Sequence, residues 1–98
     1  MPRYLIVGLV QLKPGSRPAA EQIADQGGAG MAQLPGFESV TFFLDEARSA
    51  YGAVSVWDSR EAAERADAAL TPQFEQAFGD LRDGSIESSI YEIYEHQR

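Results

Sequence analysis

The 98-residue chain carries 15 Asp and Glu residues against 8 Lys and Arg, which gives a formal net charge of −7. An acidic chain repels phosphate backbones, so its charge argues against nucleic acid as a partner. The absence of cysteine from the sequence excludes disulfides, thiolate metal sites and a cysteine nucleophile. The length and the 44% hydrophobic content predict one globular domain over residues 1–98.

An apolar run near the start predicts a first strand over Tyr4–Leu12, closed by the turn signal Lys13-Pro14-Gly15. This run is too short to span a membrane and lacks a small-residue cleavage site, so we expect a cytoplasmic protein without a membrane segment. Both faces of the strand are apolar, whereas a strand with one solvated face alternates apolar with polar residues. We therefore expect cover on both sides of the sheet.

A helix is expected from Ser16 or Arg17, with Pro18 in its first turn, to the stop signal Leu34-Pro35-Gly36. Its second half contains Gly27-Gly28-Ala29-Gly30, and each glycine costs about 1 kcal/mol relative to alanine in a helix interior. Either the helix breaks here or the glycines permit close contact with the sheet. A phosphate loop is disfavoured, because such loops follow a strand and open a helix.

Two further strands are predicted over Phe37–Leu44 and Ala50–Trp57. The polar segment Asp45-Glu46-Ala47-Arg48-Ser49 separates them. A connection this short joins neighbouring antiparallel strands, so the two form a hairpin.

A second helix is expected to begin at Asp58 or Ser59 and to carry a narrow side of alanines. Thr71-Pro72 has the pattern of a new N-cap followed by a first helical residue, so this helix is expected in two pieces with a kink. Asp83-Gly84 then turns the chain into a last strand, expected over Ile86–His96.

The order strand, helix, strand, strand, helix, strand predicts an α+β fold of the ferredoxin-like type, β-α-β-β-α-β. Right-handed crossovers give a four-stranded antiparallel sheet with both helices on one face. The other face would remain as a large exposed apolar patch. A homodimer that packs sheet against sheet removes this patch from water, as in a dimeric α/β barrel.

Three segments carry a resemblance to a known family: Leu34-Pro35-Gly36-Phe37, Val54-Ser55-Val56-Trp57-Asp58-Ser59-Arg60-Glu61-Ala62 and Tyr91-Glu92-Ile93-Tyr94-Glu95. With the element order, they resemble the antibiotic biosynthesis monooxygenase family of dimeric α/β-barrel proteins. The resemblance implies a homodimer. It also implies that some members oxygenate polyketide aromatics or quinols without metal or flavin, while others degrade heme.

The heme-degrading branch of that family can be tested residue by residue. The resemblance implies an Asn in the first strand, a Trp inside the second helix and a His that ligates iron. This chain has Gly8, Ala66 and Phe78 at those positions. Heme degradation by that route is therefore not expected.

Two single residues could carry chemistry. His96, the only histidine, could act as a general base or heme ligand, or could be a solvated residue near the end of the chain. Trp57, the only tryptophan, could wall an aromatic-substrate pocket by stacking, or could pack in the core or a dimer interface.

Tyrosines and glutamates near the predicted sheet offer weaker candidates. Glu87 and Glu95 share a strand face but lie about 27 Å apart, and Glu92 is on the opposite face, so we predict no metal site. Four tyrosines could donate hydrogen bonds to a quinone or phenol oxygen, or could pack at an edge: Tyr4, Tyr51, Tyr91 and Tyr94.

These observations leave three functions open. The first is a cofactor-independent monooxygenase-like protein that binds a small quinol or polyketide-type aromatic, with no cofactor and no metal. The second is a non-enzymatic dimer that binds a small ligand or has a regulatory or structural role. The third is isomerase or lyase chemistry, for which His96 and Arg48 are the only candidates. The expected pocket residues are Ile6, Gly8, Val10, Met31, Trp57, Phe74 and Phe78.

Overall fold

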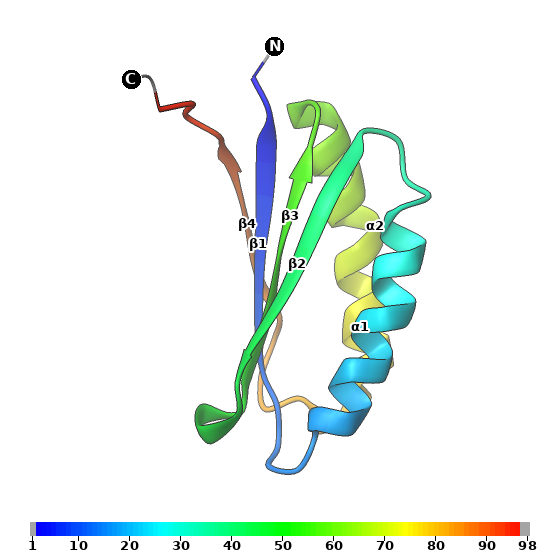
Figure 1. Ribbon diagram of the computed structural model, residues 1–98. Coiled ribbons are helices and arrows are strands. Elements are labelled where there is room, and N and C mark those ends of the chain that lie inside the picture. The colour runs from blue at the N-terminus through cyan, green and yellow to red at the C-terminus, as the bar shows by residue number, and fades with distance from the viewer. Residues whose placement is uncertain (1, 97–98) are drawn as a thin grey trace.

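Four strands form one antiparallel sheet in the order β2-β3-β1-β4, and two helices lie across one of its faces (Figure 1). The computed structural model describes residues 2–96. The elements in chain order are β1 (Tyr4–Gln11), α1 (Arg17–Met31), β2 (Phe37–Asp45), the short 3₁₀ turn η1 (Glu46–Arg48), β3 (Ala50–Trp57), α2 (Arg60–Phe78), the 3₁₀ turn η2 (Gly79–Leu81) and β4 (Glu87–Glu92). The predicted ferredoxin-like fold is confirmed.

The pairing register decides which face of the sheet each side chain occupies. Ile6 lies opposite Ser55 on β3, and Gly8 lies opposite Ala53 on β3 and Ser88 on β4. Because successive strand residues alternate between faces, these residues share the face that the helices cover.

The core between sheet and helices consists of two clusters rather than one. The first, called the upper cluster below, contains Trp57 at the end of β3 and the alanines of the first turns of α2. The lower cluster joins Val10, Tyr51 and Phe78 with residues beside them. Three alanines of α2 are buried in the upper cluster, namely Ala62, Ala63 and Ala66.

Helix α1 runs unbroken through its glycines and ends at Met31, three residues before the expected stop at Leu34. A Cβ at Gly27 would overlap the Phe74 ring of α2, and one at Gly28 would lie 3.3 Å from the Phe42 ring of β2. The glycines therefore permit close contact, and the contact at Gly27 is with the second helix.

Helix α2 begins after Ser59, whose side chain accepts a hydrogen bond from the Ala62 amide at 3.1 Å. The predicted break at Thr71-Pro72 is wrong, because the helix continues through Pro72 to Phe78. The Thr71 hydroxyl donates back to the Asp67 carboxylate at 3.0 Å instead of capping a new helix.

Strand β4 is shorter than the expected Ile86–His96. Its partner β1 begins at Tyr4, and the last pairing contact is the Ile93 amide donating to the Arg3 carbonyl at 2.8 Å. Residues beyond that point have no neighbouring strand, so the regular pairing stops.

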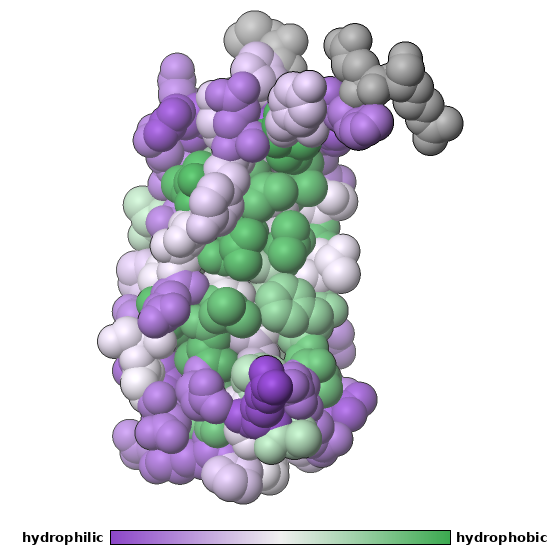
Figure 2. Space-filling model, turned by 90° about the vertical axis from the view of Figure 1, so that its left-hand side faces the viewer, coloured by the Kyte–Doolittle hydropathy of each residue, from purple (hydrophilic) through white to green (hydrophobic). Residues whose placement is uncertain are grey.

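The sheet face away from the helices, called the open face below, is apolar in its middle and hydrophilic at its ends (Figure 2). Leu9, Phe43 and Tyr91 remain 42%, 41% and 55% exposed there. The register places further apolar residues on the same face, namely Leu5, Val7, Val54 and Val56. Neither helix of the described chain is long and apolar enough to cross a membrane.

Candidate functional site

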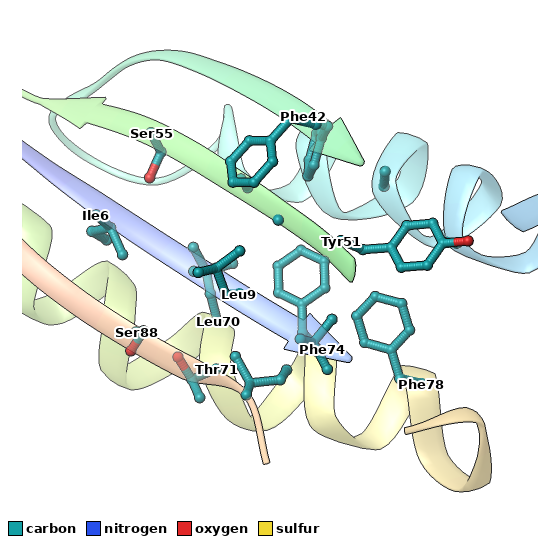
Figure 3. Close-up of a pocket in the computed structure, with 18 of the residues that line it drawn as sticks. Ile6, Leu9, Phe42, Tyr51, Ser55, Leu70, Thr71, Phe74, Phe78 and Ser88 are labelled. Carbon is teal, nitrogen blue, oxygen red and sulfur yellow. The ribbon is translucent and has the colours of Figure 1, made fainter. Parts of the chain in front are cut away.

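A pocket of about 550 Å³ lies between the sheet and the two helices (Figure 3). Its lining draws on both core clusters, with Ile6 and Leu70 from the upper one and Val10 and Phe78 from the lower. The pocket therefore occupies the gap between the clusters. Its volume lies within the range of about 300–1,000 Å³ that small-molecule sites occupy.

Aromatic rings form much of the pocket wall. Phe42 comes from β2, Tyr51 from β3, and Phe74 and Phe78 rise from α2 (Figure 3). The rings of Phe74 and Phe78 are stacked, with centroids 6.2 Å apart and an interplanar angle of 24°. Rings of this kind pack well against another planar aromatic molecule.

The floor of the pocket is the middle of the sheet, where the side chains are small. Gly8 and Ala53 lie side by side on adjacent strands, and both line the pocket. A Cβ at Gly8 would meet no atom within 4 Å. The missing side chain at Gly8 is thus one cause of the cavity.

A polar cluster interrupts the apolar lining where α2 faces β4. Oδ1 of Asp67 accepts hydrogen bonds from the Ser88 hydroxyl at 2.8 Å and from the Thr71 hydroxyl at 3.0 Å. All three residues line the pocket, and Ser88 and Thr71 approach each other from strand and helix (Figure 3). Two hydroxyl donors therefore fix the position of Oδ1.

On the opposite side of the pocket, Ser55 is 3% exposed, and its hydroxyl accepts a hydrogen bond from Nε1 of Trp57 at 2.8 Å. Trp57 itself is 0% exposed and meets Phe37 edge to face. This bond satisfies the indole N–H and holds the serine side chain in place.

The rim of the pocket between α1 and β2, called its mouth below, is lined by exposed residues. Glu21 and Asp25 stand on the helix side, and Phe42 and Leu44 on the strand side. Arg17 donates to Glu21 and to Glu46, each at 3.0 Å. The hydrogen bond to Glu21, followed by that to Glu46, raises the pKa of Arg17, which stays charged.

Six of the seven expected pocket residues lie around this cavity: Ile6, Gly8, Val10, Met31, Phe74 and Phe78. Trp57 lies in the upper core cluster beside the pocket and does not line it. Sequence reasoning missed Asp67, Thr71 and Ser88. Whether any of these residues binds a ligand stays a prediction.

The other candidates lie elsewhere. His96 is exposed beyond the end of β4, and Arg48 is exposed and paired with Asp45. Glu92 accepts from the Tyr4 hydroxyl at 3.2 Å, whereas Tyr91 and Tyr94 are exposed. Within residues 2–96, no group of three or more His, Cys, Asp and Glu side chains is arranged to hold a metal ion.

Residues 3–78 match the family model described as antibiotic biosynthesis monooxygenase. The chain belongs to this family. The resemblance inferred from the three sequence segments is confirmed. The match spans both helices and the first three strands, so it includes most of the pocket, while Ile86 and Ser88 lie beyond it.

Solved structures share the antibiotic biosynthesis monooxygenase fold over nearly the whole chain. SnoaB, a cofactor-independent oxygenase from Streptomyces nogalater, is 20% identical, with a TM-score of 0.75 and coverage of 96% of this chain and 95% of that chain. NE2512, a protein of unknown function from Nitrosomonas europaea, is 11% identical, with a TM-score of 0.80 and coverage of 100% and 95%. Rv0793 from Mycobacterium tuberculosis is 11% identical, with a TM-score of 0.77 and coverage of 98% and 99%. No curated protein matches the chain.

Proposed function

We propose that this family member is a cofactor-independent monooxygenase-like protein that acts on a small planar aromatic of the quinol or polyketide type. The observation that carries the proposal is the pocket between sheet and helices, whose walls are aromatic and whose floor is left open by Gly8. The likeness in fold to the cofactor-independent oxygenase SnoaB supports the same reading.

In a reaction of this type the substrate itself reduces molecular oxygen. A ring methylene becomes a carbonyl, one oxygen atom stays on the carbon, and the other leaves as water with both hydrogens. The protein then has to orient the ring and exclude bulk water. An apolar cavity with stacked rings such as those of Phe74 and Phe78 suits that task.

A specific observation also favours a second candidate, a non-enzymatic protein that binds a small ligand. Of the described lining residues, only Asp67, Glu21, Asp25 and Tyr51 are titratable, and Asp67 is held by two hydroxyls. No histidine, lysine or cysteine is present among these lining residues to act as a base or nucleophile. Isomerase or lyase chemistry gains no support, because His96 and Arg48 are exposed outside the pocket.

The proposal includes a homodimer that buries the open face of one chain against that of another. The apolar middle of that face supports this arrangement, because a contiguous exposed apolar patch marks an interaction surface. A self-complementary apolar surface fits a two-fold interface. Dimerisation would leave the mouth between α1 and β2 accessible, because it is on the helix side, whereas Leu9 and Phe43 line the pocket from the open face and would lie at the interface.

The proposal predicts oxygen uptake above the uncatalysed rate with members of a quinol and anthrone panel. Gly8→Leu should abolish the enzymatic part, because the new side chain occupies the pocket floor without a clash at its Cβ. Gly30→Leu is the matched control, since Gly30 is exposed, lies outside this pocket and also has room for a Cβ. An oxygen electrode and product chromatography measure both.

Uptake equal to the uncatalysed rate across the panel would reject the monooxygenase proposal. Equal activity of the Gly8 and Gly30 variants would reject this pocket as the site. Ligand binding without turnover would favour the second candidate.

A further inference from the structure

We propose that the Asp67 carboxylate accepts a hydrogen bond from a hydroxyl group on the ligand. The pocket then selects neutral, hydroxyl-bearing fused-ring aromatics and rejects anionic ones. This inference rests on the proposed function only for the place where the ligand binds.

The hydrogen bonds of Asp67 leave half of its carboxylate available. Ser88 and Thr71 both donate to Oδ1, and no hydrogen bond from the described residues reaches Oδ2. A carboxylate that lines an apolar cavity accepts strongly, because the surrounding protein screens charge less than water does. A ligand hydroxyl is the partner that this free oxygen lacks.

The charge of the lining argues against an anionic ligand. Among the described residues around the pocket, three are carboxylates, namely Glu21, Asp25 and Asp67, and none is Lys, Arg or His. Arg17, close to the mouth, is already bound to two glutamates. A carboxylate or phosphate on the ligand would meet like charge without compensation.

The positions of two serines indicate a ligand of more than one ring. Ser55 lies opposite Ile6, and Ser88 lies opposite Gly8, on the strands that flank β1. Two strand spacings and two residues of offset place their Cα atoms roughly 12 Å apart. The Ser55 hydroxyl accepts from Trp57, so its own proton can be donated to a ligand oxygen at that end.

Three probes of the same ring size separate the effect of a donated hydrogen bond from the effect of negative charge. They are naphthol, methoxynaphthalene and naphthoate, each substituted at the same ring position. Calorimetry near neutral pH with the full chain measures their dissociation constants. Naphthol should bind roughly ten-fold or more tightly than methoxynaphthalene, which cannot donate. Naphthoate should bind more weakly than either, because it is anionic.

Asp67→Asn is the decisive variant. Its amide oxygen can still accept from Ser88 and Thr71, while its amide nitrogen donates where Oδ2 accepted. The affinity for naphthol should fall by roughly ten- to a hundred-fold, and the affinity for naphthoate should rise. Asp80→Asn is the control, because Asp80 is exposed and does not line the pocket.

Naphthoate bound as tightly as naphthol, or no measurable binding of any probe, would overturn the inference. Equal naphthol affinities of the Asp67 and Asp80 variants would also overturn it. The probe series on the unsubstituted chain decides the matter even if the Asp67 variant does not fold. Naphthol binding as expected, without oxygen uptake on any substrate, would reject the monooxygenase and leave the inference standing.

Discussion

Gly27 is a residue of α1 that lies directly against a side chain of α2. Its missing side chain makes room for the Phe74 ring, which also forms part of the pocket wall. Gly30, one turn further along α1, has no atom within 4 Å of an added Cβ. The two glycines therefore have the same helix propensity and different surroundings, which allows propensity and packing to be measured separately.

Gly27→Ala should be less stable than Gly30→Ala by about 1–3 kcal/mol of unfolding free energy. Both changes gain up to about 1 kcal/mol from helix propensity, but only the first forces a ring to move in a packed interior. Urea unfolding followed by circular dichroism measures the difference. Equal stabilisation of both variants would show that Phe74 moves aside without cost.

The sequence analysis did not select Asp67, although helical spacing places it on the inward side of α2. Asp67 lies four residues after Ala63 and three before Leu70, on the stripe that faces the sheet. A charged residue on a helix is usually solvated, and this general tendency argues against a pocket position for an aspartate. Of the two roles that the sequence left open for Trp57, the structure has the packing one, because its end of β3 packs against α2.

At the scale of elements, the strand and helix order followed from turn signals and apolar periodicity, and the errors fell at element ends and at Pro72. Thr71-Pro72 is a strong helix-start pattern, yet α2 remains continuous because its apolar side packs on the sheet along its length. Tertiary packing outweighs the local signal. The prediction for β4 is too long because the pairing of this strand depends on where β1 begins, which the sequence of β4 does not contain.

Pro72→Ala should stabilise the protein by about 1–3 kcal/mol. The proline lacks the N–H that would bond one turn back, and a proline inside a helix costs about 3 kcal/mol. The loss of proline rigidity in the unfolded chain offsets up to about 1 kcal/mol. Thermal and urea unfolding measure the net effect.

Pro18→Ala is the matched control for this change. Pro18 lies in the first turn of α1, where a backbone N–H has no partner within the helix. Only the unfolded-state effect should remain, so Pro18→Ala should be neutral or slightly destabilising. A Pro72→Ala variant that behaves like Pro18→Ala would mean that α2 already accommodates its proline without strain.

At the scale of the whole molecule, the two faces of the sheet differ in what covers them. The face under the helices holds both core clusters and most of the pocket lining. The open face has an apolar middle that nothing in the described chain covers. The apolar residues on both sides of β1 predict that both faces of the sheet are apolar. The pocket is a volume left empty between elements, and the periodicity of a sequence contains no information about such volumes.

The proposed dimer gives the prediction for the molecule as a whole. Val54 lies opposite Val7 in the middle of the open face, so Val54→Glu would place a carboxylate in an apolar interface. A two-fold interface repeats the change, and each buried unpaired charge costs several kcal/mol. Since about 1.4 kcal/mol is ten-fold in the dissociation constant, the variant should sediment as a monomer where the parent chain is a dimer.

Ala69→Glu, at an exposed position on α2, should leave the dimer intact. A parent chain that is monomeric at micromolar concentration, or a Val54 variant that remains dimeric, would contradict this arrangement.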